Sequence, residues 1–337
     1  MDLKTMPKVE LHRHLAGCIS PRIALEMAQR FNSPVPSSDL HELSSAIVCH
    51  RPLKSLQQVL DCFEVFSKLF ISPEAIQYAT RQAVLDAAAD SIRYLELRFS
   101  PGFLAYQHGL PLDEVMEAVV TGAAIASRDT GTMVPLIAIA SREMGPEICM
   151  ETFQLASRYA PPIVGVDLAG NEDDWPPELF AEAFEFSALK KLKATVHAGE
   201  QAHPENIEKA VLLLGARRIG HGITAVDHPE VADMLARKNV ALEISITSNW
   251  IINAVPSRDD HPVARLRHLG IPITINSDDP ALFGITLTGE LNLFRRLCGL
   301  SIGDVVQNQV DSLKYAFAPE VDVGIVRQEL YDWFNRG

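Results

Sequence analysis

The 337-residue sequence has no long apolar run and no excess of basic residues. No stretch approaches the ~20 apolar residues that a membrane-spanning helix needs, and the opening residues, MDLKTMPKVEL, lack the apolar core of a signal peptide. With 30 Lys and Arg against 43 Asp and Glu, the formal charge of −13 provides no basic face for phosphates. We therefore expect a soluble, cytoplasmic protein with neither a membrane nor a nucleic acid as partner.

The sequence also lacks paired cysteines. Cys18, Cys49, Cys62, Cys149 and Cys298 are odd in number and never form a C-x-x-C pair. This pattern is typical of a reducing compartment and provides no thiolate metal site. At 47% hydrophobic and 22% charged residues the composition is that of a globular protein, long enough for one large domain or two modest ones.

What the sequence does contain is a series of short apolar segments separated by segments of helical periodicity. The apolar segments are KVELH (8–12), IRYLELRF (92–99), MVPLIAIA (133–140), PIVGVDLA (162–169), KATVHA (193–198), RRIGHG (217–222), VALEIS (240–245) and IPITIN (271–276). From the third onward they recur about every 23–31 residues, which is the spacing of βα units. Their near-continuous apolar character favours parallel strands covered on both faces.

Eight such units predict an α/β fold of the TIM type, a (β/α)8 barrel, whose plain form has about 250 residues. The surplus lies mainly at about 20–90, between the first and second strands, where helical patterning predicts inserted helices that cover the barrel mouth. No linker divides the chain, so we expect a single domain over residues 1–337. The alternative, an open doubly wound sheet, would normally carry an early glycine-rich phosphate turn, and none is present.

Polar residues gather where the predicted strands end. They are His12 and His14 on the first strand, His197 and Glu200 on the fifth, His221 on the sixth, and Asp278 and Asp279 on the eighth. Side chains alternate along a strand, so His12 and His14 share a face and both imidazoles could reach one ion. Three histidines and an aspartate suit Zn²⁺ with room for a water molecule. Each motif also fits an ordinary turn or helix start, but four of them at one rim favour a site.

The motifs around these residues resemble those of the adenosine deaminases of the amidohydrolase superfamily, over nearly the whole chain. They are ELHRHLAG (10–17), YLELRFSPGFLA (94–105), DLAGNE (167–172), TVHAGE (195–200), RIGHG (218–222), TSN (247–249) and NSDDP (276–280). The resemblance implies one zinc ion per chain and a purine nucleoside as substrate. It implies that the zinc ligands are His12, His14, His197 and Asp278, and that His14 also lines the substrate site. It further implies that Glu200 faces the substrate ring, that His221 faces the attacking water, and that Asp279 and the backbone N–H of Gly170 contact the purine N7 and N3.

The chemistry of hydrolytic deamination at C6 of a 6-aminopurine fits these residue types. Zn²⁺ lowers the pKa of a bound water toward 7. Glu200 is the candidate acid for N1, and it needs a raised pKa to be protonated near neutrality. His221 can orient the nucleophile, and Asp278 can accept its proton. A hydrogen bond from Asp279 to N7 also requires a proton between them, and two adjacent carboxyl groups near a metal favour a shifted pKa.

Ala16 departs from the family pattern, because this position is usually an aspartate that binds the 5′-hydroxyl group of ribose. Its absence predicts that a 5′-modified nucleoside is tolerated or preferred, with 6-aminodeoxyfutalosine and 5′-methylthioadenosine as alternatives to an adenosine-type substrate. Compensation by another residue, or an introduced substitution, would also explain Ala16. We expect apolar residues of the insertion, such as Leu60, Phe63 and Phe66, on the 5′ side.

Three other interpretations have less support. Binuclear members of the superfamily use a carboxylated lysine on the fourth strand, and PIVGVDLA (162–169) has none. Cytidine-type zinc deaminases use an H-x-E…P-C-x-x-C pattern, which is also missing. A non-catalytic nucleoside-binding relative would normally have lost a ligand or the catalytic glutamate. The oligomeric state cannot be predicted from this sequence.

Overall fold

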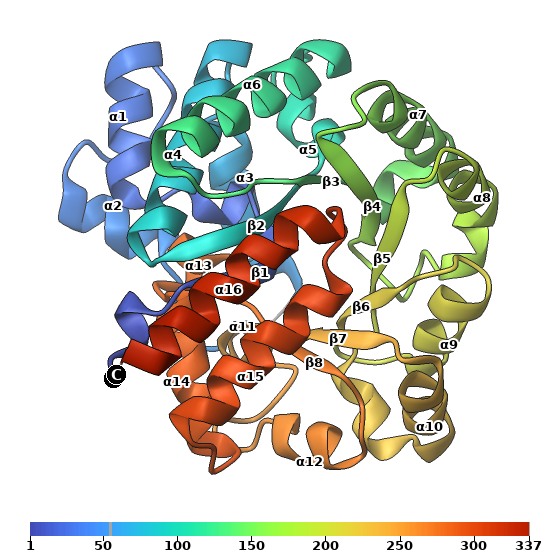
Figure 1. Ribbon diagram of the computed structural model, residues 1–337. Coiled ribbons are helices and arrows are strands. Elements are labelled where there is room, and N and C mark those ends of the chain that lie inside the picture. The colour runs from blue at the N-terminus through green and yellow to red at the C-terminus, as the bar shows by residue number, and fades with distance from the viewer. Residues whose placement is uncertain (54–55, 337) are drawn as a thin grey trace.

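The computed structural model describes residues 1–53 and 56–336 (Figure 1). Eight parallel strands form the sheet in the order β1 to β8. They are β1 (Lys8–His14), β2 (Ile92–Phe99), β3 (Leu136–Ser141), β4 (Ile163–Ala169), β5 (Lys193–Ala198), β6 (Arg218–His221), β7 (Ala241–Ile244) and β8 (Ile273–Ile275). Each of the eight segments expected to form a strand does so, with shifts of a few residues at the ends.

Backbone hydrogen bonds join the end of β1 to the loop after β8 and so bring the first and last strands of the barrel together. The N–H of His14 donates to the carbonyl of Asp278 at 2.9 Å, and the N–H of Asp278 donates to the carbonyl of His12 at 3.1 Å. The predicted TIM-type barrel is thus confirmed, and an open doubly wound sheet is excluded. These bonds also hold the end of β1, which carries His12 and His14, against the loop that carries Asp278.

Helices surround the strands (Figure 1). They are α1 (Pro21–Phe31), α2 (Leu40–Ile47), α3 (Leu56–Ser67), α4 (Pro73–Ala89), α5 (Pro101–Tyr106), α6 (Leu112–Thr130), α7 (Gly145–Arg158), α8 (Ala181–Leu189), α9 (Pro204–Leu212), α10 (Pro229–Lys238), α11 (Ile246–Ile251), α12 (Val263–His268), α13 (Pro280–Phe283), α14 (Leu287–Leu297), α15 (Ile302–Ser312) and α16 (Glu320–Arg336). Short 3-10 helices are η1 (Leu3–Thr5), η2 (Ala16–Cys18), η3 (Arg142–Met144), η4 (Pro177–Phe180), η5 (Ile223–Asp227) and η6 (Leu313–Tyr315). None of the described helices combines the length and apolar character needed to cross a membrane.

The segment expected as an insertion, about 20–90, forms α1 to α4 between β1 and β2 (blue to cyan in Figure 1). Its helices begin where the sequence provides caps: Ser20 and Ser72 accept from backbone N–H groups in the first turns of α1 and α4, and each is followed by a proline. Phe66 and Phe70 are fully buried and join the insertion to the apolar layer around the barrel.

Charged side chains, rather than an apolar core, fill part of the barrel interior. Glu96, Arg98, Arg218 and Glu243 lie on β2, β6 and β7 and are all fully buried. Arg218 donates to Oε2 of Glu96 and to Oε1 of Glu243, each at 2.5 Å, and Arg98 donates to Oε2 of Glu243 at 2.8 Å. A buried charge without a partner would cost several kcal/mol, so this pairing is what permits charges there. We call these four residues the interior charge network.

Candidate active site

The four residues expected to bind a metal meet at the C-terminal end of the barrel. Nε2 of His14 lies 3.2 Å from Nε2 of His12 and 3.3 Å from Nε2 of His197. Oδ1 of Asp278 lies 3.1 Å from Nε2 of His12 and 3.2 Å from Nε2 of His14. Strands β1 and β5 and the loop after β8 therefore bring one ligand atom each from four side chains to a common point.

His221, at the end of β6, is a fifth side chain that reaches this point. One ligand atom from each of His12, His197, His221 and Asp278 lies within 4.8 Å of the others. Nε2 of His221 is also 3.2 Å from Oε1 of Glu200 and 3.9 Å from Oδ2 of Asp278. Proximity alone therefore does not distinguish His14 from His221 as the third histidine ligand.

Two of the histidines, His12 and His197, contact a carboxylate through Nδ1, so that their Nε2 atoms face the common point. Nδ1 of His12 lies 2.7 Å from Oε2 of Glu243, and Nδ1 of His197 lies 3.1 Å from Oδ1 of Asp167. Burial alone would raise the pKa of Asp167, but the charges of His197 and Arg98 hold that pKa below its usual range. A carboxylate that accepts from Nδ1–H leaves the Nε2 lone pair free for a metal.

The donor set fits a divalent metal ion. Bare Nε2 lone pairs and carboxylate oxygens that face one buried point repel one another unless a proton or a metal ion lies among them, and this nitrogen-rich set suits Zn²⁺ among the common ions. The carboxylates that orient His12 and His197 are the usual outer partners of metal-binding histidines.

Two of the converging residues, His221 and Asp278, have backbone conformations that residues other than glycine rarely adopt. His221 has φ of 60° and Asp278 has φ of 62°, both in the left-handed region. Non-glycine residues are uncommon there, and such strain is found most often at functional sites. The local sequence supports the turn after β6, because Gly222 follows His221 with φ of 65°.

Two further carboxyl groups at the site, Glu200 and Asp279, have raised pKa values. Burial raises the pKa of Glu200 to about 8, helped by the negative charges of Asp278 and Glu172. The Glu200 side chain keeps 27% of its surface exposed, and it lines the cavity that a substrate would fill. Burial, with the charges of Asp278 and Glu200, also raises the pKa of Asp279 well above its ordinary value. Among the described residues, Oδ1 of Asp279 has no hydrogen-bond partner.

Backbone contacts fix the turn that carries Glu200. The carboxylate of Glu172, in the loop after β4, accepts from the backbone N–H of Gly199 at 2.9 Å and of Glu200 at 3.2 Å. It also accepts from Nδ2 of Asn206 at 3.1 Å. These bonds hold the backbone of the turn, so the carboxyl group of Glu200 stays available, with Oε1 3.2 Å from Nε2 of His221.

A cavity of about 720 Å³ lies above these residues, a volume that suits a small molecule of nucleoside size. The sequence-predicted residues that line it are His14, Ala16, Gly170, His197, Glu200, His221, Asp278 and Asp279. Gly17 lies directly behind Asp279, where a Cβ atom would stand 1.8 Å from Oδ1. Gly170 has φ of 114°, and a Cβ atom there would stand 2.4 Å from Oε2 of Glu143. Only glycine fits at either position.

Apolar residues form one wall of the cavity. Leu53, Cys62 and Phe63 come from the insertion, and Phe103 of α5 contacts Phe63 edge to face with ring centroids 6.2 Å apart. Of the residues expected on the 5′ side, Phe63 therefore lines the cavity. The expectation for Phe66 is wrong, because its ring is fully buried in the apolar layer. The side chain of Leu60 lies outside the described residues.

The sequence analysis did not predict a role for the buried residues that contact the metal-site histidines from inside the barrel or pair with those contacts. Arg98, Asp167 and Glu243 lie inside the motifs or strands singled out above, yet no role was expected for them. The available signal was the alternation of charged with apolar residues in LELRF (95–99), GVDL (165–168) and LEIS (242–245). A charge on the inward face of a strand buried on both faces requires partners inside the barrel.

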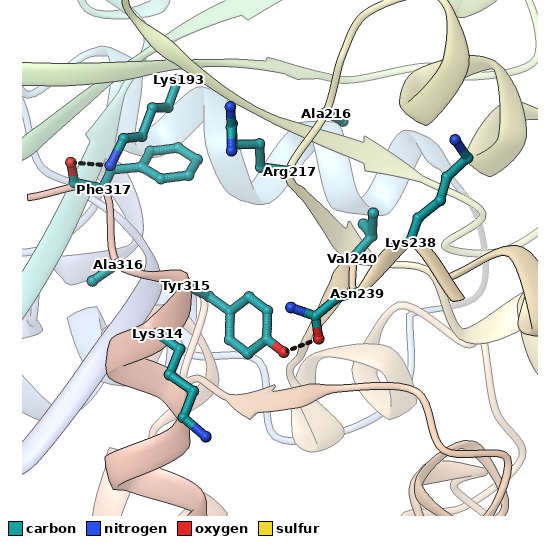
Figure 2. Close-up of a pocket in the computed structure, with 10 residues that line it drawn as sticks. All are labelled: Lys193, Ala216, Arg217, Lys238, Asn239, Val240, Lys314, Tyr315, Ala316 and Phe317. Atoms are coloured by element: carbon teal, nitrogen blue, oxygen red, sulfur yellow. Dashed lines mark hydrogen bonds between the residues drawn. The ribbon is translucent and has the colours of Figure 1, made fainter. Parts of the chain in front are cut away.

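A second cavity of about 460 Å³ lies at the N-terminal ends of β5 to β7 (Figure 2). Its lining includes Lys193 and Tyr315, whose polar atoms are already used within the protein. Nζ of Lys193 donates to the carbonyl of Phe317 at 2.8 Å, and the hydroxyl of Tyr315 donates to Oδ1 of Asn239 at 2.8 Å (Figure 2). No carboxyl group or histidine lines this cavity among the described residues. The candidate chemistry therefore lies at the opposite end of the strands.

Comparison with known proteins agrees with this geometry. The family model described as adenosine deaminase matches residues 7–333. The adenosine deaminase of Edwardsiella ictaluri is 35% identical over 321 residues, which cover 95% of this chain and 96% of that protein. An adenine deaminase from Arthrobacter aurescens superposes with a TM-score of 0.90 at 26% identity and covers 98% of this chain and 99% of its own.

Two further solved structures are also similar. An amidohydrolase from Burkholderia ambifaria with bound zinc has a TM-score of 0.88 at 26% identity, over 99% of this chain and 92% of its own. The N6-methyl-AMP deaminase of Arabidopsis thaliana has a TM-score of 0.86 at 28% identity, over 99% of both chains. Family model, relatives and fold all agree, so the chain belongs to the adenosine deaminase family and is a hydrolase of carbon–nitrogen bonds in cyclic amidines.

Proposed function

We propose that the chain is a zinc-dependent hydrolase that replaces the 6-amino group of a purine nucleoside with oxygen and prefers a nucleoside without a free 5′-hydroxyl group. One observation carries the deaminase part of the proposal. A nitrogen-rich metal donor set and a carboxylic acid with a pKa of about 8, Glu200, line the same cavity. A non-catalytic nucleoside-binding relative would have no need for that acid beside a metal site.

His12, His14, His197 and Asp278 would hold the ion. Zn²⁺, when bound, would lower the pKa of a water molecule toward 7 and so supply a nucleophile at neutral pH. The bound zinc that is named for the Burkholderia neighbour supports this choice of metal. The remaining steps depend on side chains of this chain.

Glu200 would act first as an acid. Its proton would pass to N1 of the purine ring, which lets C6 accept electron density from the nucleophile. Oδ2 of Asp278 would accept the proton that the nucleophile releases. The emptied Glu200 carboxylate would then take the remaining proton from the new C6 hydroxyl group and pass it to the amino group, which leaves as ammonia, and the proton held by Asp278 would restore the acid form of Glu200.

Asp279 and Gly170 would orient the purine. The raised pKa of Asp279 favours the acid form of that carboxyl group, which would donate a hydrogen bond to N7. The backbone N–H of Gly170 would donate to N3, as the family resemblance implies. Recognition of two ring nitrogens would place C6 and its amino group toward Glu200 and His221.

The 5′ preference rests on Ala16 and on the apolar wall formed by Leu53, Phe63 and Phe103. Ala16 lines the cavity and provides no acceptor for a 5′-hydroxyl group. Leu53, Phe63 and Phe103 offer an apolar surface for a 5′ substituent instead. We rank 5′-methylthioadenosine above 6-aminodeoxyfutalosine, because the 5′ extension of the latter ends in a carboxylate.

A 5′-nucleotide is the second candidate, since the Arabidopsis neighbour is named for a nucleotide substrate. A 5′-phosphate needs a cation beside it. Among the described lining residues Arg98 is the one Lys or Arg, and its guanidinium already donates to Asp167 and Glu243. The uncharged 5′ group is therefore favoured.

Ammonia release by the zinc-loaded protein tests the proposal. We would compare kcat/KM for adenosine, 5′-deoxyadenosine, 5′-methylthioadenosine, 6-aminodeoxyfutalosine and AMP. A tenfold advantage for the uncharged 5′-modified nucleosides over adenosine, about 1.4 kcal/mol, would support it. A clear advantage for adenosine would show that another residue compensates for Ala16. If none of them reacts while zinc is bound stoichiometrically, the deaminase proposal is wrong.

A further inference from the structure

A chain of three side chains runs from His221 away from the cavity. Nδ1 of His221 lies 3.2 Å from Nδ2 of Asn249 on α11, and Oδ1 of Asn249 lies 3.1 Å from Nε2 of His261. All three residues are buried, and neither Asn249 nor His261 lines the cavity. We call His261, Asn249 and His221 the relay.

A backbone group sets the direction of every hydrogen bond in the relay. The N–H of Val263 donates to Nδ1 of His261 at 3.1 Å, so that nitrogen carries a lone pair. His261 is only 5% exposed, and burial lowers its pKa to about 4, so its ring is neutral near pH 7. A neutral ring with a bare Nδ1 carries its proton on Nε2. His261 is therefore a donor toward Asn249.

The proton on Nε2 of His261 fixes the orientation of the Asn249 amide and, through it, the tautomer of His221. Oδ1 of Asn249 accepts from His261, so the amide nitrogen Nδ2 faces His221 and donates to Nδ1. The reverse orientation would place the amide N–H groups against the Nε2–H of His261 and leave buried donors unsatisfied, at a cost of about 1–3 kcal/mol each. With Nδ1 accepting, the proton of a neutral His221 lies on Nε2, the nitrogen that faces the cavity.

We propose that His261 and Asn249 are positioning residues that hold His221 as the neutral Nε2–H tautomer, so that His221 is a hydrogen-bond donor in the site and neither a metal ligand nor a base. The catalytic consequence rests on the proposed function, whereas the tautomer itself does not. A metal ligand needs a lone pair on Nε2, which this tautomer lacks.

The tautomer resolves the choice between the two histidines that compete for the ion. His14 remains as the third histidine ligand, and His221 donates toward Oε1 of Glu200, 3.2 Å away. An Oε1 that accepts from His221 leaves the acid proton of Glu200 on Oε2. The relay thus orders the proton that the reaction needs, and the same single Nε2–H would turn from Glu200 to the attacking oxygen during the reaction.

Nitrogen-15 NMR of histidine-labelled, zinc-loaded protein tests the tautomer directly, with His221→Gln to assign the His221 signals. We expect a protonated Nε2 and a bare Nδ1 for His221. A proton on Nδ1, or zinc bound to Nε2, would overturn the proposal. The NMR measurement needs no substrate, so its result is independent of activity. A protein that deaminates none of the nucleosides would refute the proposed function, whereas the NMR spectrum alone would decide the tautomer.

Asn249→Asp tests the catalytic consequence with a side chain of the same shape. A carboxylate accepts from both histidines, draws the His221 proton to Nδ1 and leaves Nε2 bare. We expect kcat to fall on the order of 10²–10³-fold, the usual effect of losing one transition-state donor, with little change in KM. A folded variant with the swapped tautomer and unchanged kcat would show that the Nε2–H is not needed.

Variants of His261 provide the rescue. His261→Gln keeps an amide donor toward Asn249 and should retain most of kcat, whereas His261→Phe removes the donor and should lose it. Asn308→Asp is the matched control. It also removes an amide donor, because Nδ2 of Asn308 on α15 donates to the carbonyl of Ile273 on β8 at 2.8 Å. That control should lower Tm without moving the His221 signals; loss of kcat in both Asn→Asp variants alike would indicate a merely structural effect.

Discussion

Nδ1 of His12 lies 2.7 Å from Oε2 of Glu243, and the same carboxylate accepts from Arg98 and Arg218. One histidine of the metal donor set is thereby joined to the interior charge network. Burial alone would raise the pKa of Glu243, but the two guanidinium groups and His12 hold that pKa well below its ordinary value. Glu243 therefore remains an acceptor for the Nδ1–H of His12.

Glu243→Gln should weaken both zinc binding and folding. The amide is a poorer acceptor for His12, and loss of such a partner typically lowers metal affinity about 10–100-fold. It also leaves Arg98 and Arg218 short of a buried negative charge, which costs about 3–5 kcal/mol of unfolding free energy. Competition with a chelator would measure the first effect, and urea unfolding of the metal-free protein the second.

Glu96→Gln is the control for this variant. Glu96 pairs with Arg218 and accepts from the hydroxyl of Tyr94 at 2.7 Å, but no contact with a histidine is found for it among the described residues. We expect it to lose stability while zinc affinity stays within about threefold. Equal losses of affinity in both variants would contradict a specific role for the Glu243–His12 contact.

The pH dependence of kcat/KM should report the acid form of Glu200. Because burial raises its pKa to about 8, the protonated acid is present below that pH and is lost as the pH rises through it. A bound cation favours the carboxylate, so we expect the basic limb at or below pH 8. Glu200→Gln cannot supply the proton and should lower kcat about 10²–10⁴-fold and remove that limb. A variant that keeps the limb would assign it to another group.

The barrel and the converging residues could be predicted because both follow from local patterns. Apolar segments of strand length recur at the spacing of βα units, and polar residues such as His12 and Asp278 come where those segments end. Parallel strands in a closed barrel place all those ends at one rim. The chemistry of the donor set then follows from residue type alone.

The charge network and the relay could not be predicted in the same way. Glu243 and Arg98 are 145 residues apart in sequence, and only the curvature of the closed barrel makes them partners. The direction of the amide of Asn249 depends on a single backbone contact, that of Val263 with His261. No periodicity in the sequence encodes such contacts.

The stability of the metal-free protein should carry a signature of His261. Burial lowers the pKa of His261 to about 4, below the ordinary value of 6.5. Between these pH values the unfolded chain binds a proton that the folded chain does not, so stability rises with pH across the window and is lost as the pH falls. The full difference is about 3 kcal/mol. Urea unfolding should therefore show that the difference in unfolding free energy between the parent and His261→Gln changes by about this amount as the pH falls from 6.5 to 4. Above pH 6.5 that difference should stay nearly constant. A difference that does not change with pH would mean that the pKa of His261 is the same in the folded and the unfolded chain.

Ala16→Asp should move the substrate preference toward adenosine. The new carboxylate would line the cavity and accept from a 5′-hydroxyl group, and a hydrogen bond to a charged group contributes about 1.5–3 kcal/mol. The ratio of kcat/KM for adenosine to that for 5′-methylthioadenosine should rise at least tenfold, because the apolar substituent would also face a charge. Ala16→Asn is the matched control of the same shape, whose neutral amide should give a smaller rise. If the aspartate leaves the ratio unchanged, Ala16 does not contact the 5′ end, and the specificity of this enzyme is set by the apolar wall alone.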